Sequence, residues 1–274
     1  MPRPTAPDFL ALLAHKIQLP RSIEAIKTEY RSAKPFPHVV IDNMFSERSL
    51  DPLLSEIGEM TREQWANVDR DPRERTVRMR SAAEMGAAGE HLLSIVHSAA
   101  FLYFLSEITG VGELLPDPYL QGGGFAMMRR GDYFDVHADR NVAYDTGLTR
   151  RLAMIIFLNK AWKREYQGQL ELWSSDAKRC EVSIDPLFNK TILFEVAYPN
   201  FHGVPAPLAC PSDRTRQSFI VYYHTAEIPQ QRSVKPHTTI FAPHVYGASR
   251  ATVRSLVRDI TPPFLLRLAR RMFE

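Results

Sequence analysis

Cysteine is scarce in this sequence of 274 residues, which contains only Cys180 and Cys210 and no Cys-x-x-Cys motif. Two cysteines do not make a disulfide framework, so a reducing compartment is the default expectation. Apolar runs are also short, since none reaches the roughly 18 residues that a membrane span needs. The first residues carry no signal-peptide cleavage pattern. We therefore expect a cytoplasmic protein.

The net charge of the chain is small as well. The chain has 34 Lys and Arg against 31 Asp and Glu, which gives a formal net charge of +3. This balance is too mild to indicate a nucleic-acid partner by itself, and none is expected. A hydrophobic content of 45% with 24% charged residues is typical of a globular protein. The length suffices for one large domain or two small ones.

The first part of the chain has mainly helical patterns. Apolar residues at helical spacing predict amphipathic helices, the last of which is long and closed by Gly110. A β-branched run at 36–42 predicts one early strand. The stretch 61–80 is charged and non-periodic, and residues 69–75 within it are expected to form a mobile loop or lid. The predicted helices cover residues 8–19, 23–30, 49–60 and 87–108.

From Gly122 onward, short runs typical of strands alternate with turn residues. Many short strands after a helical half indicate an α+β fold with helices packed on a sheet sandwich or barrel. We expect a single domain over 1–274, with helical support at 1–118, a catalytic core at 119–226 and a C-terminal helical extension at 227–274. The predicted strands cover residues 124–128, 134–137, 151–158, 169–173, 191–196 and 218–224.

A His-x-Asp pair at His137 and Asp139 is the most informative motif. Side chains two apart on a strand point to the same face, so this pair can aim an imidazole and a carboxylate at one point. His202, far downstream, can supply a third ligand. Two histidines and one carboxylate form the arrangement found in non-haem Fe(II) oxygenases. The pair alone is more often a surface feature, and its companions in the sequence decide between the readings.

Those companions follow in a fixed order: a glycine-marked strand at 168–173, His202, and then Arg216-Gln217-Ser218. In this ordered set the sequence resembles the 2-oxoglutarate/Fe(II)-dependent dioxygenases, specifically the prolyl-4-hydroxylase-like branch. The resemblance covers roughly residues 36–43 and 119–226. It implies a double-stranded β-helix, or jelly-roll, core. It also implies a hydroxylase that binds Fe(II), 2-oxoglutarate and dioxygen.

The resemblance assigns roles to individual residues. His137, Asp139 and His202 would hold Fe(II) and leave three positions open, two for the 2-oxo acid and one for dioxygen. Arg216 would pair with the distal carboxylate of 2-oxoglutarate, because a guanidinium fork matches a carboxylate. Ser218, two residues further on, would add a hydrogen bond. The gap between His202 and Arg216 is longer than usual in the family, which leaves Arg214 as an alternative.

The sequence also departs from the collagen-type members of this branch. Its first core strand, 125–128, has no tyrosine to contact the co-substrate, and an arginine replaces their distal lysine. Gly168-Gln169 stands where they have two glycines. These differences make a collagen-type substrate doubtful. Related halogenases have glycine or alanine at the position of Asp139, so the aspartate favours hydroxylation over halogenation.

Several other polar or aromatic residues have no decided role at this stage. Arg150 and Arg151 begin an apolar strand, and a charged strand start and a substrate role are equally good explanations. Asp135 could face the substrate or point elsewhere. Packing is the simpler role for Trp162 and Trp173. His224, His237 and His244 are expected to be ordinary surface or core histidines.

Other functions have to be weighed against the oxygenase. A non-catalytic β-sandwich binding module would need no metal, and a zinc hydrolase could use the same ligands. The Arg-x-Asn-x-x-x-x-x-Arg signature of nucleic-acid demethylases is missing. The substrate could be a small molecule, an amino acid or peptide, or a sugar, and loops at 61–80 and 140–149 are expected to contact it. The basic segment 264–274 is expected to cover the core rather than bind a membrane surface; the oligomeric state is left open.

Overall fold

The computed structural model describes residues 11–67, 72–79, 81–226 and 235–242. The basic segment 264–274, His244 and most of the predicted C-terminal helical extension lie outside the described residues. The described part of that extension, 235–242, contains a short strand at Ile240–Phe241 and no helix. Within the described part, the chain forms helices, two antiparallel sheets and short 3-10 turns. The helices are α2 (Ile23–Ser32), α3 (Glu47–Glu59), α4 (Ala87–Val96) and α5 (Ala99–Thr109), and the 3-10 turns are η1 (Arg62–Gln64), η2 (Ala82–Glu84) and η3 (Arg164–Tyr166).

Serine side chains define where three of these helices begin. The hydroxyls of Ser22, Ser46 and Ser98 accept backbone N–H groups in the first turns of α2, α3 and α5, which satisfies donors that a helix start leaves unpaired. Gly110 ends α5 as predicted, with a φ of +78° that favours glycine.

Two helix predictions need correction. The long helix predicted at 87–108 is two helices, α4 and α5, which meet at an angle of 50°. Ser98 starts the second helix by accepting the N–H of Phe101 at 3.3 Å, so the chain bends there. In the predicted helix 8–19, the described residues are helical only at 11–13, and Ile17 forms an isolated antiparallel bridge with Phe45.

The larger sheet has eight strands and the smaller has five, with antiparallel neighbours. In the larger sheet the order is β1 (His38–Asp42), β10 (Lys190–Glu195), β7 (Thr149–Phe157), β12 (Arg216–Thr225), β5 (Gly124–Met128), β3 (Val77–Met79) and β2 (Trp65–Asn67), with β4 (Leu115–Pro116) also paired to β12. In the smaller sheet the order is β13 (Ile240–Phe241), β6 (Phe134–Ala138), β11 (His202–Val204), β8 (Leu170–Trp173) and β9 (Cys180–Ile184).

The non-periodic stretch 61–80 contains two short strands, which lie before and after the loop predicted at 69–75. Strands β2 and β3 in this segment pair with each other, and β3 pairs with β5. Val77 and Met79 are buried and flank the less buried Arg78, as expected of a half-buried strand. The segment therefore extends the larger sheet.

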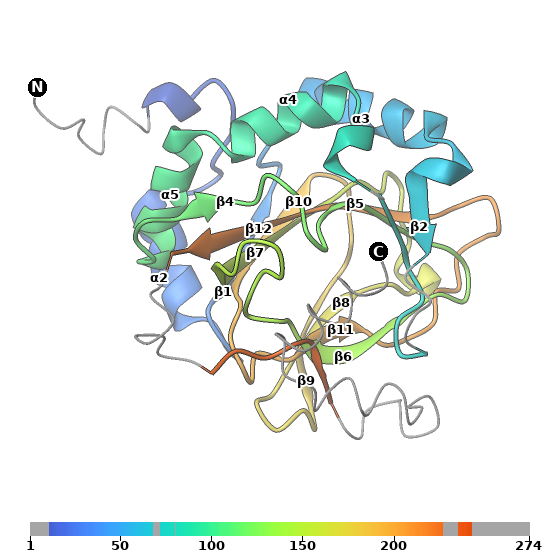
Figure 1. The fold of residues 1–274 in the computed structure, drawn as a ribbon. Helices are drawn as coiled ribbons and strands as arrows, with labels where there is room; N and C mark the ends of the chain where they lie inside the picture. Colours follow the sequence, from blue (N-terminus) through green and yellow to red (C-terminus); the bar gives the residue numbers. More distant parts are fainter. Residues whose placement is uncertain (1–10, 68–71, 80, 227–234, 243–274) are drawn as a thin grey trace, which may run out of the picture.

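The two faces of the larger sheet have different partners (Figure 1). On β12, Phe219, Val221 and Tyr223 belong to the hydrophobic core shared with the helices. The alternate residues Ile220 and Tyr222 belong to a second core shared with β8 and β11 of the smaller sheet. This alternation places one layer of helices on one face and a space between two sheets on the other.

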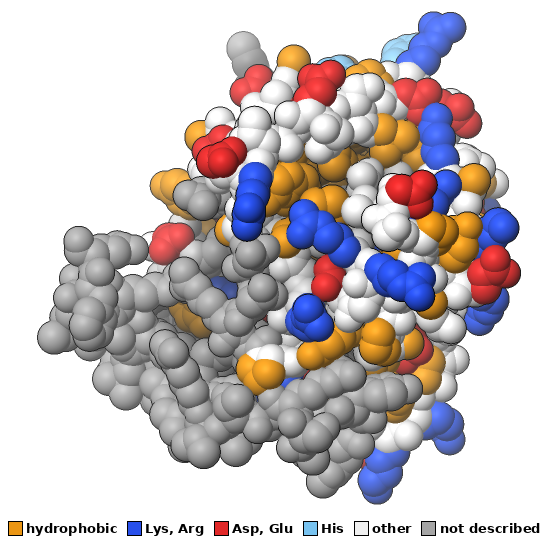
Figure 2. Space-filling view, turned by 90° about the vertical axis from the view of Figure 1, so that its right-hand side faces the viewer, with side chains coloured by type: hydrophobic (Ala, Val, Ile, Leu, Met, Phe, Trp, Pro, Cys, Tyr) orange, Lys and Arg blue, Asp and Glu red, His pale blue; other side chains and the backbone are white. Residues whose placement is uncertain are grey.

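The predicted fold class, α+β with a jelly-roll core, is confirmed, and the two sheets are not closed into a barrel. No single helix among the described residues is long and apolar enough to span a membrane, and only the bent pair α4–α5 together meets that length and composition. On the face drawn in Figure 2, the described surface carries Lys and Arg side chains interspersed with acidic and apolar ones.

Candidate metal centre

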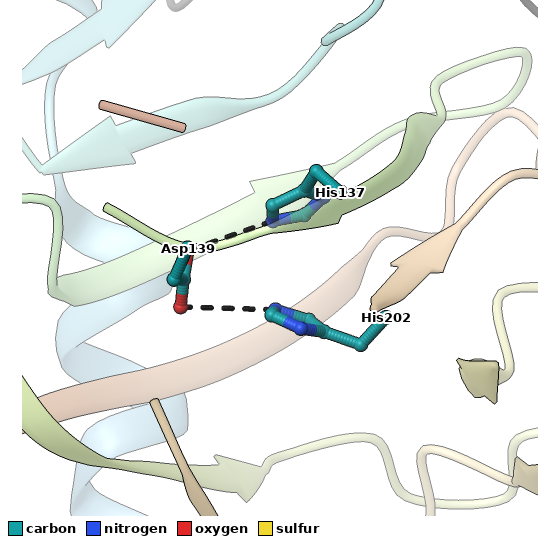
Figure 3. Close-up of side chains that lie close together, drawn as sticks. All are labelled: His137, Asp139 and His202. Carbon is teal, nitrogen blue, oxygen red and sulfur yellow. Dashed lines mark ion pairs between the residues drawn. The ribbon is translucent and has the colours of Figure 1, made fainter. Parts of the chain in front are cut away.

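Three residues from the two paired strands β6 and β11 form a compact buried group (Figure 3). His137 lies on β6, Asp139 follows directly after the last residue of that strand, and His202 begins β11. His202 is therefore a strand residue. The side chains of His137 and Asp139 reach the same side because they are two positions apart.

The ligand atoms of the three side chains lie within 4.8 Å of one another. His137 Nε2 is 3.5 Å from Asp139 Oδ1, and His202 Nε2 is 3.7 Å from Asp139 Oδ2. All three residues are at most 8% exposed. Two imidazoles and a carboxylate gathered at one point, away from solvent, are a donor set that can hold a divalent metal ion.

Both imidazole rings are oriented by backbone carbonyls two residues earlier. His137 Nδ1 donates to the carbonyl oxygen of Asp135 at 2.8 Å, and His202 Nδ1 donates to that of Asn200 at 3.3 Å. A carbonyl can only accept, so these bonds place the proton on Nδ1 and leave the Nε2 lone pair facing Asp139. This is the usual way in which a protein fixes the tautomer of a metal-ligating histidine.

The electrostatics of the group also suit a cation. Burial would raise the pKa of Asp139, but the neighbouring His137 and His202 side chains hold this pKa well below its usual range. Burial, together with the charge of His137, lowers the pKa of His202 to about 4. Asp139 Oδ2 is buried without a hydrogen-bond partner. An ionised carboxylate and a neutral imidazole are thus ready to bind metal.

A cavity between the sheets opens beside this group and contains both predicted co-substrate residues, Arg216 and Ser218. They lie two apart on β12, and both are buried. The cavity is lined mainly by apolar side chains. Its other lining residues are Thr76, Arg78, Ala126, Met128, Phe134, His137, Asp139, Ile155, Leu170, Phe194, His202, Gly203, Val204, Ile220 and Tyr222.

Arg216 is a buried cation without a carboxylate within 4.0 Å among the described residues. Its Nε donates to the carbonyl oxygen of Gly168 at 2.7 Å, and its guanidinium lies 5.1 Å from the centre of the Phe157 ring. Burial lowers the pKa of Arg216 to about 10, so the group stays charged at neutral pH. Arg214 points elsewhere, since its Nη2 donates to the exposed carbonyl oxygen of Lys160 at 2.6 Å.

Sequence reasoning missed several residues of the cavity. Thr76 and Arg78 come from the segment expected to contact substrate, but they line the cavity from a strand. Tyr222 was not singled out, although its even spacing from Arg216 and Ser218 on one strand signals that it shares their face. The expected lining loop 140–149 contributes none of the lining residues found in the described part of the chain.

The undecided residues can now be placed. Arg150 is 2% exposed, so an ordinary charged strand start is excluded for it, whereas Arg151 is partly exposed. Asp135 is buried and supplies its backbone carbonyl to His137. The remaining predictions concern aromatic residues and histidines: Trp162 packs in the core, Trp173 packs at its edge, His224 is buried and His237 is partly buried.

Comparison with known proteins agrees with this geometry. Residues 123–224 match the 2OG-Fe(II) oxygenase superfamily, and this range includes the three candidate ligands, Arg216 and Ser218. The match is confined to this part of the chain. The predicted enzyme class, a 2-oxoglutarate-dependent dioxygenase, and the predicted cofactors Fe(II), 2-oxoglutarate and dioxygen agree with this match and with the three clustered ligand side chains. The binding module and the zinc hydrolase are not favoured.

Individual similar proteins are described as prolyl hydroxylases. A 64-residue stretch is 36% identical to prolyl 3-hydroxylase OGFOD1 of Mus musculus, covering 22% of the chain and only 12% of the mouse protein. A prolyl-4-hydroxylase from Pseudomonas putida has a similar fold, with a TM-score of 0.53 and 15% identity over 75% of this chain and 100% of that one.

A second solved structure has the same fold. It is a prolyl hydroxylase from Trichoplax adhaerens in complex with a peptide fragment of the hypoxia inducible factor oxygen degradation domain. Its TM-score is 0.53 and its identity 20%, over 74% of this chain and 88% of that one.

Proposed function

We propose that this protein hydroxylates an unactivated C–H bond of a small molecule, an amino acid or peptide, or a sugar-type substrate, while 2-oxoglutarate is converted to succinate and CO2. The observation that carries the proposal is the sharing of one cavity by the His137–Asp139–His202 group and the unpaired cation Arg216. A metal-binding group next to a buried guanidinium suits a ligand that chelates through one end and carries a carboxylate at the other.

Each residue has a separate task in this proposal. His137, Asp139 and His202 would hold Fe(II) through Nε2, a carboxylate oxygen and Nε2. The bound iron supplies the chemistry of dioxygen activation, and the protein supplies binding and orientation. Arg216 would pair with the distal carboxylate of 2-oxoglutarate, and Ser218 would donate a hydrogen bond to it. Apolar side chains such as Met128, Ile155 and Leu170 would keep water away from this charge pair.

Gly168 supports the proposed role of Arg216. Its φ is +86°, and a Cβ at this position would lie 3.0 Å from Arg216 Cδ. Its carbonyl oxygen holds Arg216 Nε at 2.7 Å. The glycine therefore allows close approach and orients the guanidinium into the cavity. The glycine-marked strand noticed in the sequence has a physical reason here.

The proposed substrate class is taken from the descriptions of similar proteins. The relatives named above are described as prolyl hydroxylases, and one was solved with a peptide, so a small molecule or peptide is the proposed substrate. We further propose that residues 1–274 act as a single oxygenase domain in the cytoplasm. Both cysteines are free in the structure, and the region described includes strands from both ends of the predicted core.

The test is a turnover assay on the full chain. Protein supplied with Fe(II), 2-oxoglutarate and air is expected to form succinate and CO2 in equal amounts, slowly without substrate and faster when a substrate is present. The Asp139→Ala variant should lose this activity. If the wild-type protein binds Fe(II) but forms no succinate with any peptide, amino-acid or sugar library, the proposed function is wrong.

A further inference from the structure

Two further arginines lie near Tyr222, which lines the metal cavity: Arg78 lines the cavity itself, whereas Arg150 contacts it through the Tyr222 ring. The guanidinium of Arg150 lies 3.6 Å from the centre of the Tyr222 ring, and Arg78 lines the same cavity. Arg150 Nη2 donates to the carbonyl oxygen of Gln121 at 2.7 Å, and Arg78 Nη1 donates to that of Gly122 at 3.1 Å. The two guanidinium groups thus hold consecutive carbonyls of one loop, and both lie near Tyr222.

Arg150 is the unusual member of the pair. It is 2% exposed, its Nε is buried without a hydrogen-bond partner, and no carboxylate of the described residues lies within 4.0 Å of it. By contrast, Arg78 forms an ion pair with Glu74 at 3.0 Å. A buried charge that is not paired carries a large desolvation cost. Such a cost beside a ligand cavity indicates a binding function for Arg150.

The carboxylates near this pair are already engaged. Glu74 binds Arg78. Asp117 accepts the backbone N–H groups of Tyr119 and Gln121. Asp139 belongs to the metal group. A third cation, Arg140, stacks on Tyr144 at 4.4 Å and adds further positive charge. Asp139 and Asp117 act on the charge of Arg150 from a distance, but neither forms a direct ion pair with it among the described residues.

This cation is also well separated from Arg216. Tyr222 and Arg216 lie on the same strand, β12, six positions apart. At about 3.3 Å per residue, they are roughly 20 Å apart along the strand. 2-Oxoglutarate, a five-carbon diacid, is too short to contact Arg216 and Tyr222 at the same time. Any anion at Arg150 must therefore belong to a different molecule.

We propose that Arg150 and Arg78 form an anion-binding subsite for the substrate, which would carry a carboxylate or phosphate group. This inference rests on the proposed function, because only an enzyme has a substrate that could carry the anionic group. The binding of an anion at this site does not itself depend on turnover. A planar guanidinium with free N–H donors matches either oxyanion, and the neighbouring Tyr222 ring supports its position.

The experiment measures anion binding to the full chain loaded with Ni(II) and saturating 2-oxoglutarate, which occupies the Arg216 end. Sodium phosphate and sodium acetate are titrated separately, at ionic strength matched with sodium chloride, and affinity is obtained from the rise in melting temperature. One of the two is expected to stabilise the wild-type protein more than chloride does, and its identity distinguishes phosphate from carboxylate. Arg150→Gln should weaken this binding about tenfold or more.

Two further variants make the result decisive. Arg214→Gln removes an exposed arginine that binds the Lys160 carbonyl and should leave anion binding unchanged. Arg78→Gln should weaken binding by a smaller factor, and it decides the question if Arg150→Gln does not fold. Equal stabilisation of the wild-type protein by phosphate, acetate and chloride overturns the inference. Wild-type anion affinity in both Arg150→Gln and Arg78→Gln overturns it as well.

The affinity for 2-oxoglutarate, measured in the same variants, separates this inference from the proposed function. Unchanged 2-oxoglutarate binding in Arg150→Gln, with anion binding lost, supports the separate subsite. A loss of 2-oxoglutarate binding with phosphate and acetate binding retained would assign Arg150 to the co-substrate and overturn the inference. Arg150-dependent anion binding in a protein that makes no succinate would leave the subsite standing and count against the proposed function.

Discussion

His202 lies directly opposite His137 across the antiparallel pair of strands β6 and β11, and the centres of the two rings are 4.5 Å apart. The register of this pair decides whether the metal group forms, because a slip by one residue would turn His202 to the other face. The next residue, Gly203, allows the close approach. A Cβ there would lie 2.9 Å from both the Phe134 carbonyl oxygen and the Val136 Cα.

The first prediction concerns the shared carboxylate. Asp139→Ala should lower Fe(II) affinity by more than the roughly 10–100-fold that follows loss of an outer-shell partner, because it removes the charged donor itself. Metal content after dialysis against limiting Fe(II) measures this. Asp176→Ala, at an exposed aspartate that binds Ser174, is the control and should bind metal normally. Retention of iron by Asp139→Ala would contradict the assignment of the ligands.

A second prediction concerns Arg216. Arg216→Gln should raise the apparent KM for 2-oxoglutarate, because a carboxylate buried without its cation loses on the order of 2–5 kcal/mol of binding free energy. Steady-state kinetics with varied 2-oxoglutarate give the value, while Fe(II) affinity should stay near that of the wild-type protein. Arg214→Gln is the matched control. If the control alone raises KM, the co-substrate residue is Arg214.

Two glycines offer a matched test of the contact behind Arg216. Gly168 and Gly131 have similar φ values, +86° and +84°, but a Cβ would touch Arg216 only at Gly168, and at Gly131 it would meet nothing within 4 Å. Both alanine variants should therefore lose similar stability from backbone strain. Only Gly168→Ala should also raise KM for 2-oxoglutarate, measured at a temperature where both are folded. Equal KM values would remove the proposed positioning role of Gly168.

Acid sensitivity should depend on His224. Burial, together with the charge of Arg150, lowers the pKa of His224 from 6.5 to about 3, and both ring nitrogens are buried without hydrogen-bond partners. Between these two pH values the unfolded chain binds a proton that the folded protein does not, so stability falls as pH decreases from about 6.5 towards 3.

Replacement of His224 by leucine removes this linked proton. The unfolding free energy of His224→Leu, from urea titrations at several pH values, should therefore decrease less steeply on acidification than that of the wild-type protein. His91→Leu, at an exposed histidine of α4, should retain the wild-type slope. Parallel pH profiles for wild type and His224→Leu would show that this ring is not the source of the acid sensitivity.

The break between α4 and α5 gives a stability prediction. Ser98→Ala should lower the unfolding free energy by about 1 kcal/mol, because the first turn of α5 loses the acceptor of the Phe101 N–H. Ser94→Ala, on α4, where the hydroxyl only donates to the His91 carbonyl, should have little effect. Chemical denaturation of both variants compares them, and an equal loss would mean that capping does not stabilise this helix.

Sequence patterns predicted the fold class and the grouping of the three candidate ligands. Both rest on strand alternation and on the order of motifs along the chain, which can be read from the sequence directly. Cross-strand packing was harder to foresee. The break at Ser98 was missed because the apolar residues on both sides face the same core, which keeps the helical periodicity intact. Strands β2 and β3 have three residues each, too few to display an alternating pattern.

The environment of Arg150 could not be predicted from sequence either. An arginine is normally exposed, and its burial depends on Tyr222 from a distant part of the chain and on the Gln121 carbonyl. The same holds for Arg216 on β12, whose contact with Gly168 joins this strand to the turn before β8. Family resemblance supplied its proposed role, and only tertiary structure supplied the reason for its position.

Strand β13 has a practical consequence for anyone preparing a shorter form of this protein. The superfamily match ends at residue 224, but Ile240 and Phe241 pair with Ala138 and His137 on the outer side of β6. A fragment that stopped at the match would leave the backbone of the metal-bearing strand open along this side. Exposed edges of this kind recruit strands from other molecules. A recombinant fragment that is to remain monodisperse should therefore extend at least to Ala242, whose N–H binds the Val136 carbonyl at 2.8 Å.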